Sequence, residues 1–170
     1  MTRSISLLRF LSDAGTAAPV LGALDVDAAV FSGVRLRAPA DYVVRELRAS
    51  RMRTTAGVFD EFAAAFQFPY YFGHNRDAFD ECLRDLDDFV GAAAGYVVVI
   101  RDAERLLADR RSDLDWFTEA VLDAAEYWAA RDVVFRVVLQ HPARELLQDA
   151  AHGAAVVPLT MPEPEAGGSA

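Results

Sequence analysis

The most informative stretch of the sequence spans residues 68–83 and reads Phe68-Pro69-Tyr70-Tyr71-Phe72-Gly73-His74-Asn75-Arg76-Asp77-Ala78-Phe79-Asp80-Glu81-Cys82-Leu83. A proline and a run of aromatic residues lead into a Gly-His-Asn turn, and a segment with helical spacing follows. Phe79, Cys82 and Leu83 recur at spacings of three and four, so they share one face of a helix. The opposite face carries three acids, Asp77, Asp80 and Glu81, together with Arg84. The segment therefore predicts an amphipathic helix with an acidic outer face.

Helices and strands alternate on both sides of this stretch. Three phenylalanines at spacings of three and four predict a preceding helix, which Thr54 or Thr55 caps and Pro69 stops. A long helix over residues 112–130 has Ser112 as its expected N-cap. We expect strands within residues 41–48, 96–100 and 133–139, and a short last helix at residues 143–152. This alternation predicts an α/β domain with a small parallel sheet.

The two ends of the chain are less regular. Residues 1–33 hold small apolar clusters among Gly, Pro and Ala, and we expect an N-terminal extension that is irregular or forms a short edge strand. Residues 158–170 are rich in Pro, Glu and Gly, which is typical of a disordered tail. The expected organisation is therefore one central domain at residues 34–157 with two flanking segments.

Composition limits the kinds of protein that the chain can be. It has 170 residues, 53% of them hydrophobic, and a formal net charge of −9. That length favours one domain, that hydrophobic fraction supports a packed core, and an acidic surface repels a nucleic-acid backbone. Cys82 is the single cysteine and excludes an internal disulfide. Because no apolar run reaches the length of a membrane span and residues 1–19 lack a secretory signal, we expect a cytoplasmic protein with neither a membrane nor a nucleic-acid partner.

The acidic face of the helix after Gly73 has two interpretations. Asp77 and Glu81 lie four residues apart, and like charges at that spacing destabilise an isolated helix by about 0.2–0.5 kcal/mol. Asp77 lies in the first turn, where the helix dipole offsets part of this cost. Acids beside exposed aromatic residues favour a basic protein partner, with an aromatic ring as the anchor. The alternative is a solvated helix face that binds nothing.

The residues at 68–83 resemble the central motif of the barstar family, intracellular inhibitors of a secreted bacterial ribonuclease. The shared pattern is Pro, aromatic residues, Gly, Asn, Asp-Ala, an acid and Cys-Leu, and the order of the surrounding elements agrees over about residues 40–140. The resemblance implies an α/β fold with a three-stranded parallel sheet packed with helices, over a barstar-like domain at residues 34–157.

The resemblance also implies roles for individual residues. The acidic helix would plug the active site of a ribonuclease, with Tyr71 as the aromatic contact beside it. Asp77 would pair with basic residues of the nuclease, and Glu81 would enter the pocket that normally holds the RNA phosphate. Gly73 and Asn75 would shape the turn, since glycine tolerates a positive φ and asparagine caps helices.

Several positions depart from the family pattern. Glu81 stands where the family has Asp, so its carboxylate reaches one methylene further, and Asp80 stands where the family has Trp. On the long helix, a gapless match gives Tyr127 and Arg131 at the positions of two further family glutamates, with Glu126 adjacent to the first. The expected partner-binding residues are Tyr71, Gly73, Asn75, Asp77, Asp80, Glu81 and Tyr127.

We expect the chain to be a non-enzymatic inhibitor that blocks the active site of a basic secreted ribonuclease or related toxin, in an immunity or antitoxin role, with its acidic helix mimicking RNA phosphate. The alternative is an interaction module with the same fold and a non-ribonuclease partner. A third hypothesis, which no further His or Cys cluster supports, is a metal-dependent hydrolase that uses His74, Asp77 and Glu81. We expect no cofactor, and a monomer before a partner binds.

Overall fold

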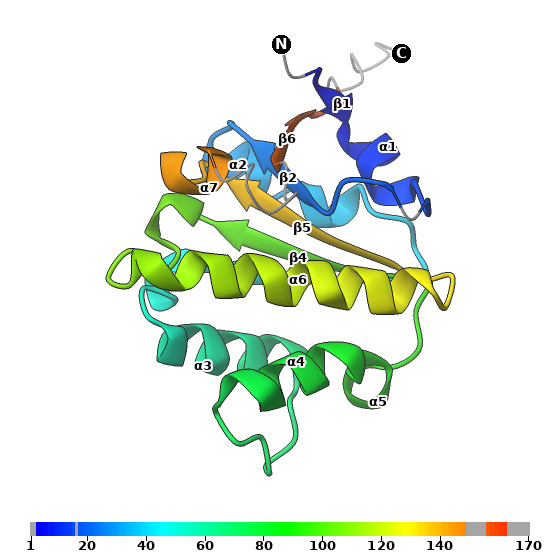
Figure 1. Cartoon of the computed structure of the whole chain (residues 1–170). Coiled ribbons are helices and arrows are strands. Elements are labelled where there is room, and N and C mark those ends of the chain that lie inside the picture. The colour runs from blue at the N-terminus through cyan, green and yellow to red at the C-terminus, as the bar shows by residue number, and fades with distance from the viewer. Residues whose placement is uncertain (1–2, 16, 149–155, 163–170) are drawn as a thin grey trace.

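A computed structural model describes residues 3–15, 17–148 and 156–162. Its centre is a six-stranded parallel sheet with the strand order β1-β6-β2-β5-β4-β3 (Figure 1). The strands are β1 (Ile5–Ser6), β2 (Leu21–Leu24), β3 (Tyr42–Arg48), β4 (Gly95–Arg101), β5 (Val134–Gln140) and β6 (Val156–Thr160). The helices are α1 (Leu7–Ser12), α2 (Ala28–Phe31), α3 (Thr55–Phe66), α4 (Arg76–Arg84), α5 (Leu86–Val90), α6 (Leu114–Ala129) and α7 (Arg144–Gln148).

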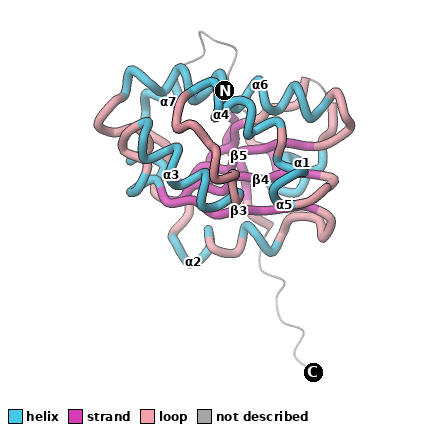
Figure 2. The backbone as a smooth tube through the Cα atoms, turned by 90° about the horizontal axis from the view of Figure 1, so that it is seen from below, coloured by secondary structure: helices cyan, strands magenta, loops and turns pink. Residues whose placement is uncertain are grey.

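The sheet has helices on both faces. On one face, α3, α4, α5 and α6 form a layer, as Figures 1 and 2 show from two directions. On the other face, α1 and α2 pack against the sheet with their own apolar cluster. β4 contributes to both cores, because Val98 and Ile100 point into the first and Val97 and Val99 into the second. Burial on both faces explains why the run at residues 96–100 is apolar without alternation.

The predicted central elements are confirmed. β3, β4 and β5 coincide with the three expected strands, and α3 follows Thr54, whose hydroxyl accepts the amide of Gly57 at 3.2 Å. α3 ends at Phe66, where Gln67 takes a left-handed conformation (φ 57°) ahead of Pro69. The α/β class with a parallel sheet is therefore confirmed.

The predicted start of the long helix is wrong by two residues. Ser112 lies inside the 3-10 turn η4 (Arg111–Asp113), and α6 begins at Leu114. Asp113 occupies the N-cap position without capping, because its carboxylate instead accepts hydrogen bonds from the Thr55 hydroxyl at 2.7 Å and from Arg76 at 3.0 Å. These bonds tie the start of α6 to α3 and α4.

The predicted number of strands is also wrong, because the sheet has six strands rather than three. The edge strand expected within residues 1–33 is present as β1, but the same segment also holds β2, which lies inside the sheet between β5 and β6. Gly22 of β2 allows the close approach of β6, since a Cβ there would lie 2.4 Å from Cδ1 of Leu159. Both ends of the chain therefore extend the predicted three-stranded core.

The predicted C-terminal segments overlap the described residues only in part. Residues 158–160 belong to β6, so the expected tail does not begin at Pro158, and residues 163–170 lie outside the described part of the chain. The helix expected at residues 143–152 is described as α7 as far as Gln148, and the rest of that prediction lies outside the described residues.

Candidate protein-binding face on α4

The acidic helix α4 is held at its start and along its inner face. The side chain of Asn75 caps α4, because its Oδ1 accepts the amide of Ala78 at 2.9 Å. On the inner face, Phe79 is fully buried and lies 5.1 Å from the ring of Phe62 and 5.6 Å from that of Phe59. Asp77 and Glu81 remain exposed on the outer face. The helix thus presents two carboxylates on a fixed support.

The turn before α4 exposes two aromatic side chains. Tyr70 and Tyr71 are 101% and 71% exposed, and their ring centroids lie 5.5 Å apart. The neighbouring rings of Phe68 and Phe72 point inward and meet edge-on at 5.1 Å. This anchor holds the turn, which projects from the lower end of the molecule beside α4 (Figure 1). Large exposed aromatic rings on an anchored turn are typical of binding anchors.

The expected role of Gly73 in the turn is corrected. The positive φ belongs to His74 (φ 49°), while Gly73 is not among the residues with positive φ. Gly73 is needed for space, since a Cβ there would lie 2.8 Å from Nδ2 of Asn75, which donates to the Gly73 carbonyl at 3.3 Å. The glycine therefore lets the Asn75 side chain fold back and cap the helix.

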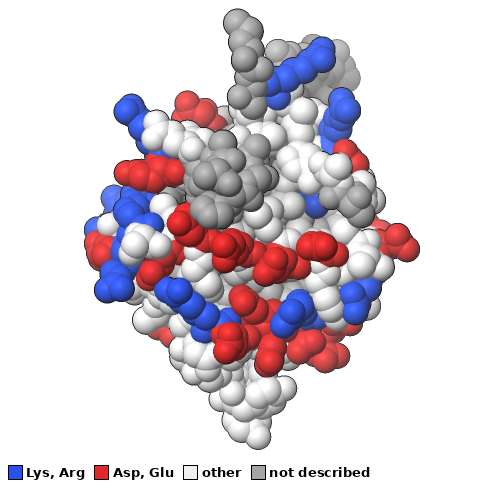
Figure 3. Space-filling view, in the orientation of Figure 1, with Lys and Arg blue, Asp and Glu red and all other residues white. Residues whose placement is uncertain are grey.

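The acidic surface continues from α4 onto α6. Figure 3 shows Asp and Glu side chains gathered over both helices, above an uncharged tip at the bottom of the view. Glu119 and Asp123 of α6 are close enough to act electrostatically on Asp80 of α4. We call the five residues Asp77, Asp80, Glu81, Glu119 and Asp123 the acidic face. Sequence reasoning missed its two α6 members, although Glu119, Asp123 and the predicted Tyr127 recur every four residues and so share a side of α6.

Asp80 lies at the centre of this acidic face. Partial burial raises the pKa of Asp80, and the negative charges of Asp123, Asp77 and Glu119 raise it further, while Arg84 opposes them. Its Oδ1 is buried and accepts no hydrogen bond from any described residue. A cation brought against α4 would relieve the repulsion. Chemically, the arrangement suits a basic partner.

Tyr127 is less available than its predicted role requires. Arg131 lies over the Tyr127 ring with its guanidinium 3.5 Å from the ring centroid, and its Nη1 donates to the Tyr127 carbonyl at 3.0 Å. The adjacent Trp128 donates from Nε1 to the carbonyl of Leu83 at 2.8 Å, which fixes this part of α6 against α4. Glu126, noted beside Tyr127, lines a cavity on another side of α6. The structure thus brings Asp123, rather than Glu126, to Asp80.

Arg76 links the acidic face to the start of α6. Its guanidinium donates to Asp113 at 3.0 Å and lies 5.0 Å from the centroid of the Trp116 ring. Both contacts engage the positive charge of Arg76 away from Asp77 and Glu81. Neither Asp77 nor Glu81 forms an ion pair with a described residue.

The geometry of this face does not favour a nucleophilic cysteine or a metal site. Cys82 is only 7% exposed, and burial, with help from Asp85 and Glu81, raises the pKa of its thiol to about 11, which suits packing rather than nucleophilic attack. No three His, Cys, Asp or Glu side chains among residues 3–15, 17–148 and 156–162 are placed to hold a metal ion, and His74 pairs instead with Asp60 at 3.4 Å. In the same part of the chain, no helix is both long and apolar enough to cross a membrane.

Comparison with known proteins bears on the segment that builds this face. A family model described as Barstar (barnase inhibitor) matches residues 42–140, more than half of the 170-residue chain. The matched segment runs from the start of β3 to the end of β5 and includes the aromatic turn, α4 and α6. No curated protein that was compared with the chain matches it. The match over residues 42–140 shows that the chain belongs to the barstar family.

Proposed function

We propose that the chain is a protein inhibitor of a basic secreted ribonuclease or related toxin. The observation that carries the proposal is the placement of Asp77 and Glu81 on the exposed side of a capped, anchored helix, next to the exposed ring of Tyr71. Membership of a family described as barnase inhibitors supports it. In this role the chain acts as an immunity protein or antitoxin inside the cell that produces the nuclease, and it catalyses nothing itself.

The proposed mechanism is substitution of carboxylates for phosphate. A ribonuclease must hold cationic side chains where negative charge develops on the phosphate in the transition state. Glu81 and Asp77 enter that site from α4 and form charge-assisted hydrogen bonds with those cations. Asp80 and Asp123 add negative charge behind them, and Tyr71 packs against the rim of the active site. Because the helix is already ordered, little conformational entropy is lost on binding.

The test is inhibition of RNA cleavage by purified guanyl-specific bacterial ribonucleases. The original chain should suppress cleavage, and Asp77→Ala and Glu81→Ala should each relieve the suppression by tenfold or more, the scale of about 1.5–3 kcal/mol for hydrogen bonds to charged groups. Glu104→Ala is the matched control, since Glu104 is an exposed acid in η3 (Ala103–Arg105), outside α4 and α6. Unchanged cleavage with every nuclease tested would remove ribonuclease inhibition.

The second candidate is an interaction module whose partner is not a ribonuclease. It is motivated by Asp80 at the family's Trp position and by Arg131, whose guanidinium lies over the ring of Tyr127. A pull-down decides between the two candidates. A basic partner without nuclease activity, lost with Asp77→Ala and Glu81→Ala, would favour the module.

A further inference from the structure

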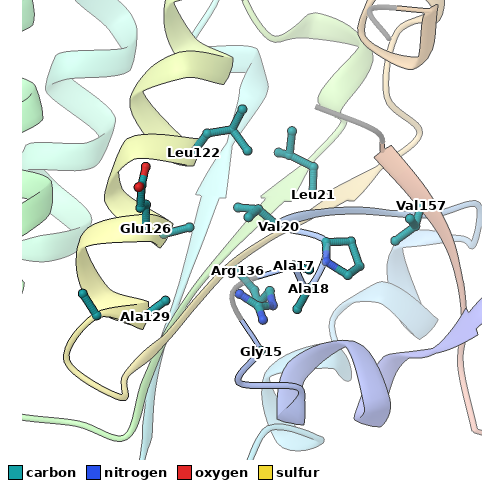
Figure 4. A pocket seen from close by; sticks show the side chains of 13 residues that line it. Gly15, Ala17, Ala18, Val20, Leu21, Leu122, Glu126, Ala129, Arg136 and Val157 are labelled. Atoms are coloured by element: carbon teal, nitrogen blue, oxygen red, sulfur yellow. The ribbon is translucent and has the colours of Figure 1, made fainter. Parts of the chain in front are cut away.

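A cavity lies on the opposite side of α6 from α4. Its volume is about 710 Å³, and it is bounded by residues 17–20 ahead of β2, the second half of α6 and Arg136 of β5 (Figure 4). Most of its walls are small apolar side chains, among them Ala18, Pro19, Leu122, Ala125 and Ala129. Volume and lining both fall in the range of sites that take small organic molecules.

The sheet topology explains why this space exists. β5 pairs with β4 from Val134 onward, whereas β2 pairs with β5 only from Val137 onward. The β2 side of Val134–Arg136 therefore has no strand beside it among the described residues, and Ala17, Ala18 and Pro19 lie at the cavity instead. Alanines at positions 125, 129 and 130 of the facing helix leave the gap unfilled.

Arg136 places a buried positive charge in the wall of this cavity. The residue is 4% exposed, and its hydrogen bonds go to neutral backbone carbonyls: Nε donates to Phe10 at 3.1 Å, Nη1 to Phe135 at 2.8 Å and Nη2 to Asp13. None of the described carboxylates forms an ion pair with it. Burial lowers the pKa of Arg136, and the attraction of Asp13 offsets only part of that effect.

The guanidinium retains donors for a ligand. Arginine has five N–H groups, and three of them are used by the three carbonyls. One N–H on each Nη has no acceptor among the described residues, so two donors of a charged group remain for an anion. A buried cation with unused donors beside an apolar cavity points to an anion with an apolar body.

We propose that the cavity binds a small organic monocarboxylate, with its carboxylate on Arg136 and its apolar chain along Ala125 and Ala129 of α6. The charge of Glu126, which also lines the cavity, sets the selectivity, because a second carboxylate on the ligand would be repelled there. This site is separate from the acidic face and does not depend on the proposed inhibition.

Hexanoate, hexanamide and hexanedioate are the probes, titrated into the full chain by calorimetry. Hexanoate should bind and shift the NMR signal of the Arg136 Nε–H group. Hexanamide has the same length but no charge, so its affinity should be lower by about tenfold or more. Hexanedioate should also bind more weakly, and Glu126→Gln should restore part of its affinity. Equal binding of hexanoate and hexanamide, or no binding of hexanoate at millimolar concentrations, would overturn the proposal.

Two variants separate binding from folding. Arg136→Met removes the charge and also the hydrogen bonds to the end of α1. A loss of hexanoate binding in this variant could therefore come from unfolding alone. Ala129→Leu keeps Arg136 and fills the cavity from α6, and it should abolish hexanoate binding in a folded protein. Ala64→Leu, an exposed alanine on α3, is the matched control and should bind as the original chain does. Unchanged hexanoate binding in folded Ala129→Leu would contradict the proposal.

Discussion

The folded protein disfavours the negative charge of Asp80. Burial and the negative charges of Asp123, Asp77 and Glu119 raise the pKa of Asp80 above its ordinary value of 3.8. In the unfolded chain the same carboxyl group ionises more easily. Well below pH 3.8 neither state carries the charge, so no cost exists. The cost to the folded state grows as the pH rises from 3.8 to the higher folded pKa, and it is complete above the folded pKa.

Asp80→Asn should therefore stabilise the free protein. We expect the free energy of unfolding at about pH 7 to rise by about 0.5 kcal/mol, the scale of like-charge pairs on helices, and the gain to vanish at about pH 3. Urea denaturation at the two pH values measures both effects. Glu104→Gln is the control, because Glu104 is an exposed acid outside the acidic face, and it should leave the free energy of unfolding close to that of the original chain. A gain that persists at low pH would rule out the electrostatic cause.

Functional residues could be predicted from the sequence only where they lie close together along the chain. The motif at residues 68–83 placed Tyr71, Asn75, Asp77 and Glu81 on one segment, because a single turn and helix determine their relative positions. Asp123 could not be assigned in the same way, since its contact with Asp80 depends on how α6 packs against α4. The position of the Arg131 guanidinium over the Tyr127 ring likewise depends on side-chain rotamers, which helical spacing does not specify.

At the scale of one element, α4 depends on its cap. Without the Asn75 side chain the amide of Ala78 has no described acceptor from the turn, and the Gly73 carbonyl loses its bond as well. Asn75→Ala should lower the free energy of unfolding by about 1 kcal/mol. It should also weaken binding of a ribonuclease target, because the carboxylates of α4 are then less well fixed.

Asn75→Asp is the matched control for the cap. Its carboxylate keeps an acceptor for the Ala78 amide, so stability should stay close to that of the original chain. Denaturation and inhibition measured on both variants separate the cap from the family motif. If Asn75→Asp loses as much stability as Asn75→Ala, the cap does not account for the stability of α4.

At the scale of the whole molecule, the sheet extends beyond what sequence patterns indicate. β2 has four residues and β1 has two, which is too short for a periodic signal. Their partners lie far along the chain, since Leu21 pairs with Val137 on one side and Val156 on the other. Only long-range packing selects such pairs, so local spacing predicted β3, β4 and β5 and missed the other half of the sheet.

The contact between Gly22 and Leu159 tests whether the two ends of the chain complete one sheet. A Cβ on Gly22 would lie 2.4 Å from Cδ1 and 2.8 Å from Cγ of Leu159, so Gly22→Ala should cost about 1–3 kcal/mol by overpacking. The cost should fall close to zero in a Leu159→Ala background, where the crowding side chain is absent. A double-mutant cycle of urea unfolding therefore gives a coupling energy between β2 and β6, two strands separated by more than a hundred residues. An equal cost of Gly22→Ala in both backgrounds would mean that β6 does not lie against β2 in solution.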